Sequence, residues 1–461
     1  MAMGKKPAAR QGSPLWVTTA DLPTSAGHPF FERLNRVLDE GGFDAFVEGR
    51  CAVFYASRMG RPSLRPGRYF RMLFIGYFEG LSSERGIAWR VADSLSLRSF
   101  LDLDVTEASP DHSTLSRTRR LIDVETHEAV FAWVLERLSE AGLVRGKTVG
   151  VDATTLEANA AMRSIERRDT GESYEAFLQR LAEASGLATP TRAELARFDR
   201  SRKDKKTSNK DWRSPQDPDA KITKMKDGRT HLAHKAEHAV DMETGAILSA
   251  TVQDASAGDS ATLPETLTTA AEQVEAVQPD GAGVEEVVAD KGYHSDKTLV
   301  ALDEVGVRSY ISEPERGRRR WQDKKTGETP PDKRAAQKAL YGNRRRIRGN
   351  RGRRLQRRRG ELVERPFAHQ YETGGLRRVW VRGHENVRKR VLIQAAGCNL
   401  GLLLRTLTGV GTPRSLQGRA LSAICGLIGR LLDCWGRLTA GWGPKWTPAT
   451  LAGSIAHCQA G

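Results

Sequence analysis

The spacing of apolar residues changes near residue 145, and this change constrains the fold more than any other feature of the sequence. From residue 30 to about 143, apolar side chains recur every three or four residues, as they do along one face of a helix. Beyond residue 145, short β-branched runs such as 147–152 alternate with helical segments. The sequence therefore predicts a helical region followed by an α/β region.

The expected elements of the second region follow the order strand, hairpin, helix, strand, helix, strand. We place them at 147–152, 230–252, 263–277, 284–290, 299–305 and 307–311. Gly245 lies in the hairpin turn, where glycine accommodates a positive φ. This order favours an α/β core with a mixed sheet.

We divide the chain into four parts on these grounds. The predicted parts are a flexible tail at 1–27, a helical domain at 28–144, an α/β domain at 145–407 and a helical tail at 408–461. Residues 160–228 are polar and charged, and we interpret them as an insertion or a flexible excursion from the α/β domain.

The positive charge of the chain is concentrated in residues 316–359, which we call the basic segment. The whole chain has 73 Lys and Arg against 57 Asp and Glu, a net charge of +16, and the basic segment alone contains 19 basic residues against 3 acidic ones. Such a local excess favours a polyanionic partner, most simply nucleic acid. Trp321 and Tyr341 within it could stack on unpaired bases. A solvated loop is the alternative interpretation of the same residues.

A second basic cluster follows a helix-start signal at residues 109–113. Asp111 or Ser113 is placed to cap the helix that continues to residue 121. Arg117 and Arg119 on this helix are candidates for contact with DNA phosphates. Whether the region forms a helix-turn-helix or only a packing module stays open at this point.

Other classes of protein are disfavoured by the sequence. The five cysteines form no CxxC pair and no zinc-binding spacing, so we expect a reduced, intracellular compartment. The most apolar stretch, 391–407, contains Gln394, Asn399 and Arg405 and is short for a membrane span. We therefore expect no membrane partner.

Three carboxylates are candidates for a metal-dependent active site. Asp152 and Asp290 each end an expected strand, at the sheet edge where α/β proteins bind ligands, and Glu364 lies on a helix after the basic segment. Oxygen ligands suit Mg²⁺ or Mn²⁺, and two such ions suit phosphodiester chemistry. Glu361 is a rival for the third position. On spacing alone, a strand-end Asp is more often a turn or cap residue.

The blocks around these carboxylates resemble a known family. The sequences VGVDATT at 149–155, VADKGYHS at 288–295 and LVERPFA at 362–368 are similar to the three blocks of bacterial insertion-sequence transposases of the DDE class. Residues 60–121 resemble the N-terminal helical domain of the same proteins, and the similarity spans roughly 55–405 in the right order.

The resemblance implies an RNase H-like catalytic core in which Asp152, Asp290 and Glu364 hold two divalent ions, Mg²⁺ or Mn²⁺. It implies an enzyme that cuts double-stranded DNA at the ends of its own element and joins the freed 3′-hydroxyl to target DNA. It also implies a homodimer that brings two ends together, working in the bacterial cytoplasm in association with the nucleoid. Phosphoryl transfer of this kind depends on positioning and charge stabilisation.

Two positions depart from the family pattern. Many relatives carry a basic residue four before the catalytic Glu and a Lys seven after it, where this chain has Gly360 and Tyr371. Nearby arginines are candidates to supply the missing charge. The residues that we expect to contact DNA are Tyr293, His294, Trp321, Arg344, Arg345, Arg346, Arg357, Arg358, Arg365, Tyr371, Arg117 and Arg119.

Several of these residues have a second interpretation. Tyr293 is almost as well explained as a core aromatic, and Asp254 and Asp259 are either turn residues or additional contacts to metal or DNA. For the whole chain, the alternatives to a transposase are a decayed DNA-binding relative and an RNase H-type nuclease that never joins strands.

Overall fold

A computed structural model describes residues 28–56, 63–187, 189–202, 208–225, 227–315, 317, 319, 321–322 and 329–416. The chain divides after residue 411 into two compact units, and every element below belongs to the first. The second unit begins at residue 412, and only its first five residues are among those described. The expected tail at 1–27 and most of the tail at 408–461 lie outside the described residues.

The first region of the chain is helical, as its apolar spacing predicts. Its helices are α1 (Pro29–Glu40), α2 (Phe43–Cys51), the short 3₁₀ helix η2 (Ala52–Phe54), α3 (Pro66–Phe78), α4 (Glu84–Ala92), α5 (Leu95–Phe100), α6 (His112–Leu121) and α7 (Val124–Glu140). The core of this region is aromatic: Phe70, Phe74 and Phe78 of α3 are buried. The Asp111 side chain caps α6 by accepting from the Thr114 N–H, at 3.0 Å.

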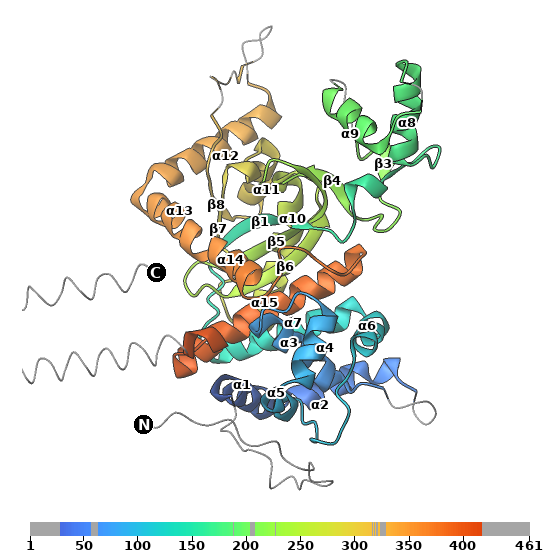
Figure 1. Cartoon of the computed structure of the whole chain (residues 1–461). Helices are drawn as coiled ribbons and strands as arrows, with labels where there is room; N and C mark the ends of the chain where they lie inside the picture. The colour runs from blue at the N-terminus through green and yellow to red at the C-terminus, as the bar shows by residue number, and fades with distance from the viewer. Residues whose placement is uncertain are drawn as a thin grey trace, which may run out of the picture. The chain divides into compact units, whose positions relative to one another are not determined.

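A six-stranded mixed sheet follows the helices (Figure 1). Its strands are β1 (Thr148–Glu157), β4 (Lys221–Lys224), β5 (Thr230–Asp241), β6 (Ile247–Asp254), β7 (Glu286–Ala289) and β8 (Arg308–Ile311). Strand β5 pairs antiparallel with β1, β4 and β6, whereas β7 pairs parallel with both β1 and β8. Gly245 in the β5–β6 turn has a φ of +82°, as the hairpin requires.

Strand β1 is longer than the sequence predicts. The expected strand ends at Asp152, but β1 continues to Glu157 because Ala153–Glu157 pair with Glu237–Ala233 of β5. Asp152 therefore lies in mid-strand, just beyond the three residues that pair with β7. The partner of this second half is almost eighty residues away, so local sequence carries little sign of it.

The two faces of the sheet are covered by different helices. Lys235 and Glu237 of β5 point to α10 (Asp259–Val277), where Glu237 accepts hydrogen bonds from Thr262 and Thr266. His238, the next residue, points to the opposite face and stacks on Phe367 of α14 (Glu364–Glu372), with ring centroids 4.1 Å apart. Opposed residues of an antiparallel pair share a face, so Asp152 lies on the α14 side with His238.

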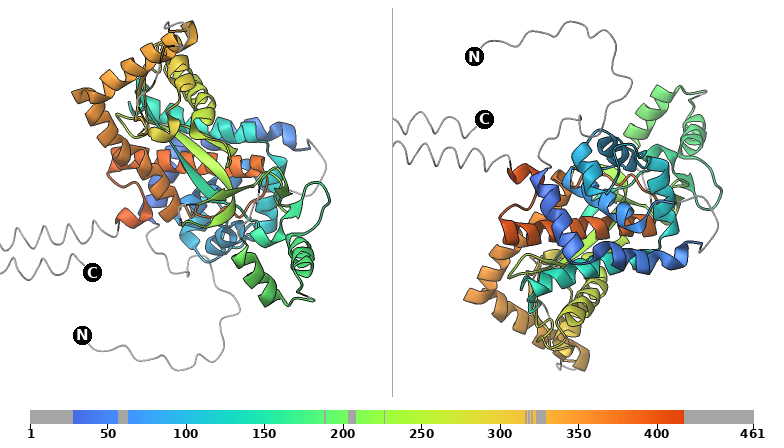
Figure 2. Two further views of the ribbon diagram at one scale, coloured as in Figure 1. Left: turned by 90° about the horizontal axis from the view of Figure 1, so that it is seen from above. Right: turned by 90° about the horizontal axis from the view of Figure 1, so that it is seen from below.

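The remaining helices of the α/β region are α11 (Asp296–Glu304), α12 (Pro331–Arg348), α13 (Asn350–Leu362) and α15 (His384–Thr408). A 3₁₀ turn, η4 (Lys291–Tyr293), follows β7. Helix α15 lies between the N-terminal helices and the sheet, in contact with α7, α3 and β6 (Figure 2). The mixed sheet with helices before and after it confirms the α/β class and is consistent with the RNase H-like core that the resemblance implies.

The polar insertion has a structure of its own, which the sequence did not predict. It contains η3 (Met162–Ser164), α8 (Tyr174–Ala184), α9 (Arg192–Ser201) and a small sheet of β2 (Glu166–Arg167) and β3 (Trp212–Arg213). A small apolar cluster around Trp212 and Ile165 holds it together. A few large side chains are enough for such a cluster, although the segment is polar on average.

The segment His384–Leu416, which includes α15, is long and apolar enough to cross a membrane by length and composition. In its most apolar window, 67% is buried inside the protein. That degree of burial is typical of a central helix in a globular fold.

Candidate active site

Strands β1 and β7 bring Asp152 and Asp290 to neighbouring positions. The parallel register pairs Gly150 with Val288, and two further residues along each strand lead to Asp152 and Asp290. Neighbouring strands lie about 4.8 Å apart, so the two positions are adjacent. Asp290 follows the last residue of β7, and its side chain accepts a hydrogen bond from the Gly292 N–H at 2.8 Å.

The junction between α13 and α14 is packed directly onto β1. A Cβ atom added at Gly150 would lie 2.5 Å from Cγ2 of Val363, so only glycine allows this approach. Val363 is fully buried, and Glu364 follows it as the first residue of α14. The close packing at Gly150 thus positions Glu364 next to β1, the strand that contains Asp152.

One arginine joins two of the carboxylates. Arg359 of α13 places Nη1 3.8 Å from Oδ2 of Asp152 and Nη2 3.5 Å from Oε1 of Glu364. Its side chain is only 16% exposed. Glu361, the rival third carboxylate, is exposed and makes no such contact among the described residues. The structure therefore brings Glu364, and not Glu361, to Asp152.

The protonation of Asp152 reflects these neighbours. Burial raises the pKa of its carboxyl to about 6, and the negative charges of Asp290 and Glu364 add to the rise. The Ala153 N–H and the Arg359 guanidinium oppose it. A carboxyl whose pKa is raised by burial and by other carboxylates is typical of a functional site.

The three carboxylates are of the right chemical type for a divalent cation, but their present spacing does not form a complete metal site. Among the residues that the structure describes, no three His, Cys, Asp or Glu side chains stand close enough together to hold a metal ion. Arg359 lies between Asp152 and Glu364 and supplies the positive charge there. The candidate ligands are carboxylate oxygens, whose negative charges repel one another. Mg²⁺ and Mn²⁺ prefer such oxygen ligands and would neutralise this repulsion.

A fourth carboxylate, Asp259, lies beside Asp290. A Cβ atom added at Gly292 would collide with the Asp259 carboxylate and lie 3.1 Å from Oδ1 of Asp290, so both acids border one small space. Lys235 of β5 forms an ion pair with Asp259, with Nζ 2.6 Å from Oδ1. The Lys235 side chain is buried, at 6% exposure. This pair links the α10 face of the sheet to the end of β7.

Tyr293 and His294 belong to the interior, and the expected DNA contact of Tyr293 is corrected accordingly. Tyr293 is fully buried, and its hydroxyl donates to Oε1 of Glu237 at 2.7 Å. Residue 294 is 3% exposed. The turn after β7 directs both side chains inward, because η4 begins at once and folds back against α10.

From residue 331 onward, almost the whole basic segment is helical rather than a solvated loop, in α12 and α13. In α12, Arg344 makes two bonds to Glu313, of 2.7 and 2.8 Å, and Arg346 donates to the carbonyl and hydroxyl of Ser309, both at 2.9 Å. Both side chains are therefore occupied by bonds within the protein. The sequence did not indicate these bonds. Arg345, between them, is exposed.

Helix α13 presents four of its arginines outward, whereas Arg351 pairs with the buried Glu286. Arg353, Arg354 and Arg357 are exposed and have no ion-pair partner among the described residues. Arg358 is exposed as well and donates to the carbonyl of Glu243 at 3.1 Å. The structure therefore shows an accessible row of cations that ends at the inward-facing Arg359.

The other expected DNA contacts differ in how accessible they are. Trp321 and Tyr341 lie near each other, with ring centroids 6.4 Å apart, and Arg365 is exposed. Tyr371 hydrogen-bonds Thr154 and the carbonyl of Thr155, two and three residues after Asp152. On α6, Arg117 is exposed, whereas Arg119 pairs with Glu84 at 2.7 Å.

Arg359 was expected only as one of several arginines that could supply charge near the third carboxylate, and Lys235 was not expected at the site. A signal for the inward direction of Arg359 was present, because Gly352 and Leu355 lie seven and four positions before it on the same helical stripe and both are buried. Lys235 lies in the middle of an expected strand, and a lysine in such a position is rarely buried without a partner.

Comparison with protein families gives two matches. Residues 20–121 match a family described as a transposase domain (DUF772), and residues 205–400 match the transposase DDE domain. The second match contains Asp259, Asp290, Arg359 and Glu364, while Asp152 precedes it. No individual curated protein gives a significant match.

Proposed function

Because the chain belongs to the insertion-sequence transposases of the DDE class, we propose that it binds the terminal inverted repeats of its element, hydrolyses a phosphodiester bond at each end and joins the 3′-hydroxyl to target DNA. The family acts on DNA and generally uses divalent metal ions. We propose Asp152, Asp290 and Glu364 as the ligands of two Mg²⁺ or Mn²⁺ ions. Divalent ions there would activate the attacking oxygen and stabilise the leaving one.

The observation that supports this site best is the arrangement around Arg359. Its guanidinium contacts Asp152 and Glu364 from two segments more than two hundred residues apart, and the pKa of Asp152 responds to Asp290 as well. Divalent cations bound by the carboxylates would neutralise them in place of Arg359. The Arg359 guanidinium would then be available to donate to the oxygens of the cleaved phosphate, whose charge grows during the reaction.

We propose Asp259 as an additional acid of the site, with Lys235 as a positioning residue. Lys235 neutralises one oxygen of Asp259 and fixes its direction toward Asp290. Asp259→Asn and Lys235→Met should each weaken Mn²⁺ binding several-fold in calorimetry without DNA. The matched control is Asp254→Asn, at an exposed turn where Asp254 accepts from Ser256. Equal Mn²⁺ affinities in all three variants would contradict the role.

DNA recognition is proposed for the outward arginines of α13, with Arg345, Arg358, Arg365, Tyr371, Trp321 and Arg117 as further contacts. A dimer is proposed because two ends must be processed together, and light scattering on the DNA complex tests it. We also propose the bacterial cytoplasm, at the nucleoid, as the location, and a division into the domains predicted from the sequence.

The decisive experiment combines duplex DNA carrying the element ends, a target plasmid and Mg²⁺. We expect joined product from the wild type. Asp152→Asn and Asp290→Asn should lose at least a thousandfold in cleavage rate while DNA affinity changes less than twofold, and Asp254→Asn should cut normally. Cutting without joining would identify a simple nuclease. Binding without cutting would identify a decayed DNA-binding protein.

A further inference from the structure

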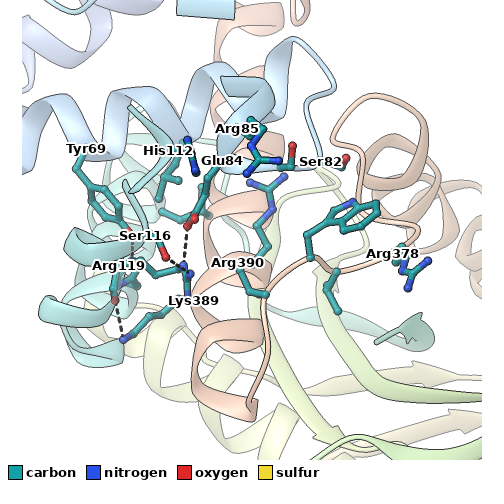
Figure 3. A pocket seen from close by; sticks show the side chains of 17 residues that line it. Tyr69, Ser82, Glu84, Arg85, His112, Ser116, Arg119, Arg378, Lys389 and Arg390 are labelled. Atoms are coloured by element: carbon teal, nitrogen blue, oxygen red, sulfur yellow. Dashed lines mark hydrogen bonds and ion pairs between the residues drawn. The ribbon is translucent and has the colours of Figure 1, made fainter. Parts of the chain in front are cut away.

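A cavity of about 490 Å³ lies where the N-terminal helices meet the second half of the chain (Figure 3). One wall comes from α3, α4, α6 and α7, and the other from residues 378–381 and α15. Residues of both family matches therefore line it. A cavity of this size can hold a small ligand or one unit of a polymer.

The floor of the cavity is neutral and fixed. Tyr69 donates its hydroxyl hydrogen to Nε2 of His127 at 3.1 Å, and Nδ1 of His127 donates to the carbonyl of Asp123 at 2.7 Å. Burial lowers the pKa of His127 to about 3, so the imidazole carries no charge at neutral pH. The floor thus offers a rigid surface without adding to the charge of the walls.

The walls carry an excess of positive charge. The lining cations are Arg85, Arg119, Arg378, Lys389 and Arg390, and the lining acid is Glu84. Glu84 pairs with Arg119 at 2.7 Å, and Lys389 pairs with Glu385 outside the cavity at 2.5 Å. The electrostatic potential inside the cavity is therefore set mainly by the remaining arginines, Arg85, Arg378 and Arg390.

Arg390 and Arg85 have no ion-pair partner in the part of the chain that the structure describes. Arg390 donates to the carbonyls of Leu81 and Gly374, at 2.9 and 3.4 Å. Burial lowers its pKa to about 10, which still leaves it charged at neutral pH. A cation held against neutral carbonyls in a cavity is stabilised when an anion enters.

Trp380 adds a flat apolar surface at the same cavity. Its indole is 48% exposed, and the Arg378 guanidinium lies 5.0 Å from its ring centroid. Its main chain is anchored, because the Asn159 side chain donates to the Trp380 carbonyl and the Val379 N–H donates to Glu157, both at 2.9 Å. A fixed exposed aromatic beside cations is the arrangement that stacks a nucleic-acid base.

We infer that this cavity binds one nucleotide of a DNA strand, with its base against Trp380 and its phosphate at Arg85 and Arg390. The inference rests on the proposed function. Glu157, which anchors Val379, is five residues after Asp152 on β1, roughly 17 Å at about 3.3 Å per residue. At about 3.4 Å per nucleotide, the bound unit lies about five nucleotides from the cleaved bond.

Photo-crosslinking of the full-length protein tests the inference directly. Duplex DNA carrying an element end would contain 5-iododeoxyuridine at one position at a time, would be irradiated with the protein in EDTA, and the modified peptides would be identified by mass spectrometry. We expect Trp380 to be modified when the substituted base is about five nucleotides from the cleavage site. Modification confined to α13 or other segments would overturn the inference and leave the proposed function intact.

Matched variants supply the second measurement. Trp380→Ala should bind the same DNA about tenfold more weakly, because one stacked base is lost. Trp89→Ala removes an indole that is 67% exposed on α4 and does not line the cavity, so it should bind as the wild type does. Equal affinities for the two variants would overturn the inference.

A free nucleotide presents the same base and phosphate as one nucleotide of a DNA strand. Thermal unfolding of the protein with millimolar AMP distinguishes these two ligands. Stabilisation by AMP that Trp380→Ala abolishes, with unchanged DNA affinity, would assign the cavity to a free nucleotide and overturn the DNA assignment. A wild type that binds no DNA at all would contradict the proposed function itself.

Discussion

Helices α12 and α13 are both rich in arginine, yet their surroundings differ. In α12, Arg344 and Arg346 are bound to Glu313 and Ser309, so these cations serve the stability of the protein. In α13, Arg353, Arg354 and Arg357 face solvent without a partner among the described residues. The net charge of a segment therefore does not tell how many of its cations are available to a ligand.

The contrast continues within α13 itself. Arg353 faces outward, whereas Arg359, near the end of the helix, faces the carboxylates of Asp152 and Glu364. The two side chains have the same charge and lie on the same helix. Their roles should differ according to what each one touches.

The largest expected effect separates these two arginines. Arg359→Met should lower the single-turnover cleavage rate about a hundredfold, because it removes a charged donor beside the reacting phosphate. Arg353→Met loses the same charge and should cut at a normal rate when DNA is saturating. Equal rates for the two variants would remove the distinction between the inward and the outward arginine.

The next effect separates the two helices. Replacing Arg353, Arg354 and Arg357 together by Gln should reduce the slope of log affinity against log salt by about 2 to 3, since each phosphate contact contributes about 0.9. Replacing Arg344 and Arg346 by Gln should leave the slope unchanged. Titrations by fluorescence anisotropy at several salt concentrations measure both, and a reversed order would place the DNA on α12.

A smaller effect concerns the carboxylate next to Arg359. The folded protein holds the Asp152 proton more tightly than the unfolded chain does, since its pKa rises from near 3.8 to about 6. The corresponding stability is present below pH 4 and is lost as the pH rises through 6. Asp152→Asn should therefore be more stable than the metal-free wild type at pH 8, by on the order of 1–2 kcal/mol.

Urea unfolding of both proteins at pH 4 and pH 8 measures this difference. At pH 4 the wild-type carboxyl is protonated, so the two proteins should have similar free energies of unfolding. A stability gain of Asp152→Asn that does not depend on pH would show that burial and the neighbouring charges do not disfavour the ionised carboxylate.

The smallest expected effect is structural. Arg344→Gln breaks a partly exposed bidentate pair and should lower the free energy of unfolding by about 1 kcal/mol or less. Arg353→Gln should leave it unchanged, because Arg353 has no ion-pair partner among the residues that the structure describes. A comparable loss in both variants would mean that Arg353 also contributes to the folded state.

The sequence predicts the fold class and the order of its elements because periodicity is a local property. The hairpin at Gly245 and the strand before Asp290 were expected close to their observed bounds. The second half of β1 was not, because Ala153–Glu157 become a strand only through pairing with β5. Pairing over that distance leaves little trace in the local sequence.

The candidate site was predictable in its carboxylates and not in its cations. Asp152, Asp290 and Glu364 stand in recognisable blocks, whereas Arg359 is one of 19 basic residues in the basic segment. Its direction depends on the helical phase set by Gly352 and Leu355. The inward position of Tyr293 depends on its hydrogen bond to Glu237, which lies on a strand more than fifty residues earlier in the sequence.

The position of α15 has a consequence for biosynthesis. This helix packs on α7 and α3 as well as on β6, but it begins at His384, long after α7 ends at Glu140. At about 5–20 residues per second, the ribosome leaves the apolar surface of α7 uncovered for tens of seconds. During that interval the apolar surface of α7 lacks its α15 partner, and a product truncated before residue 384 never gains it.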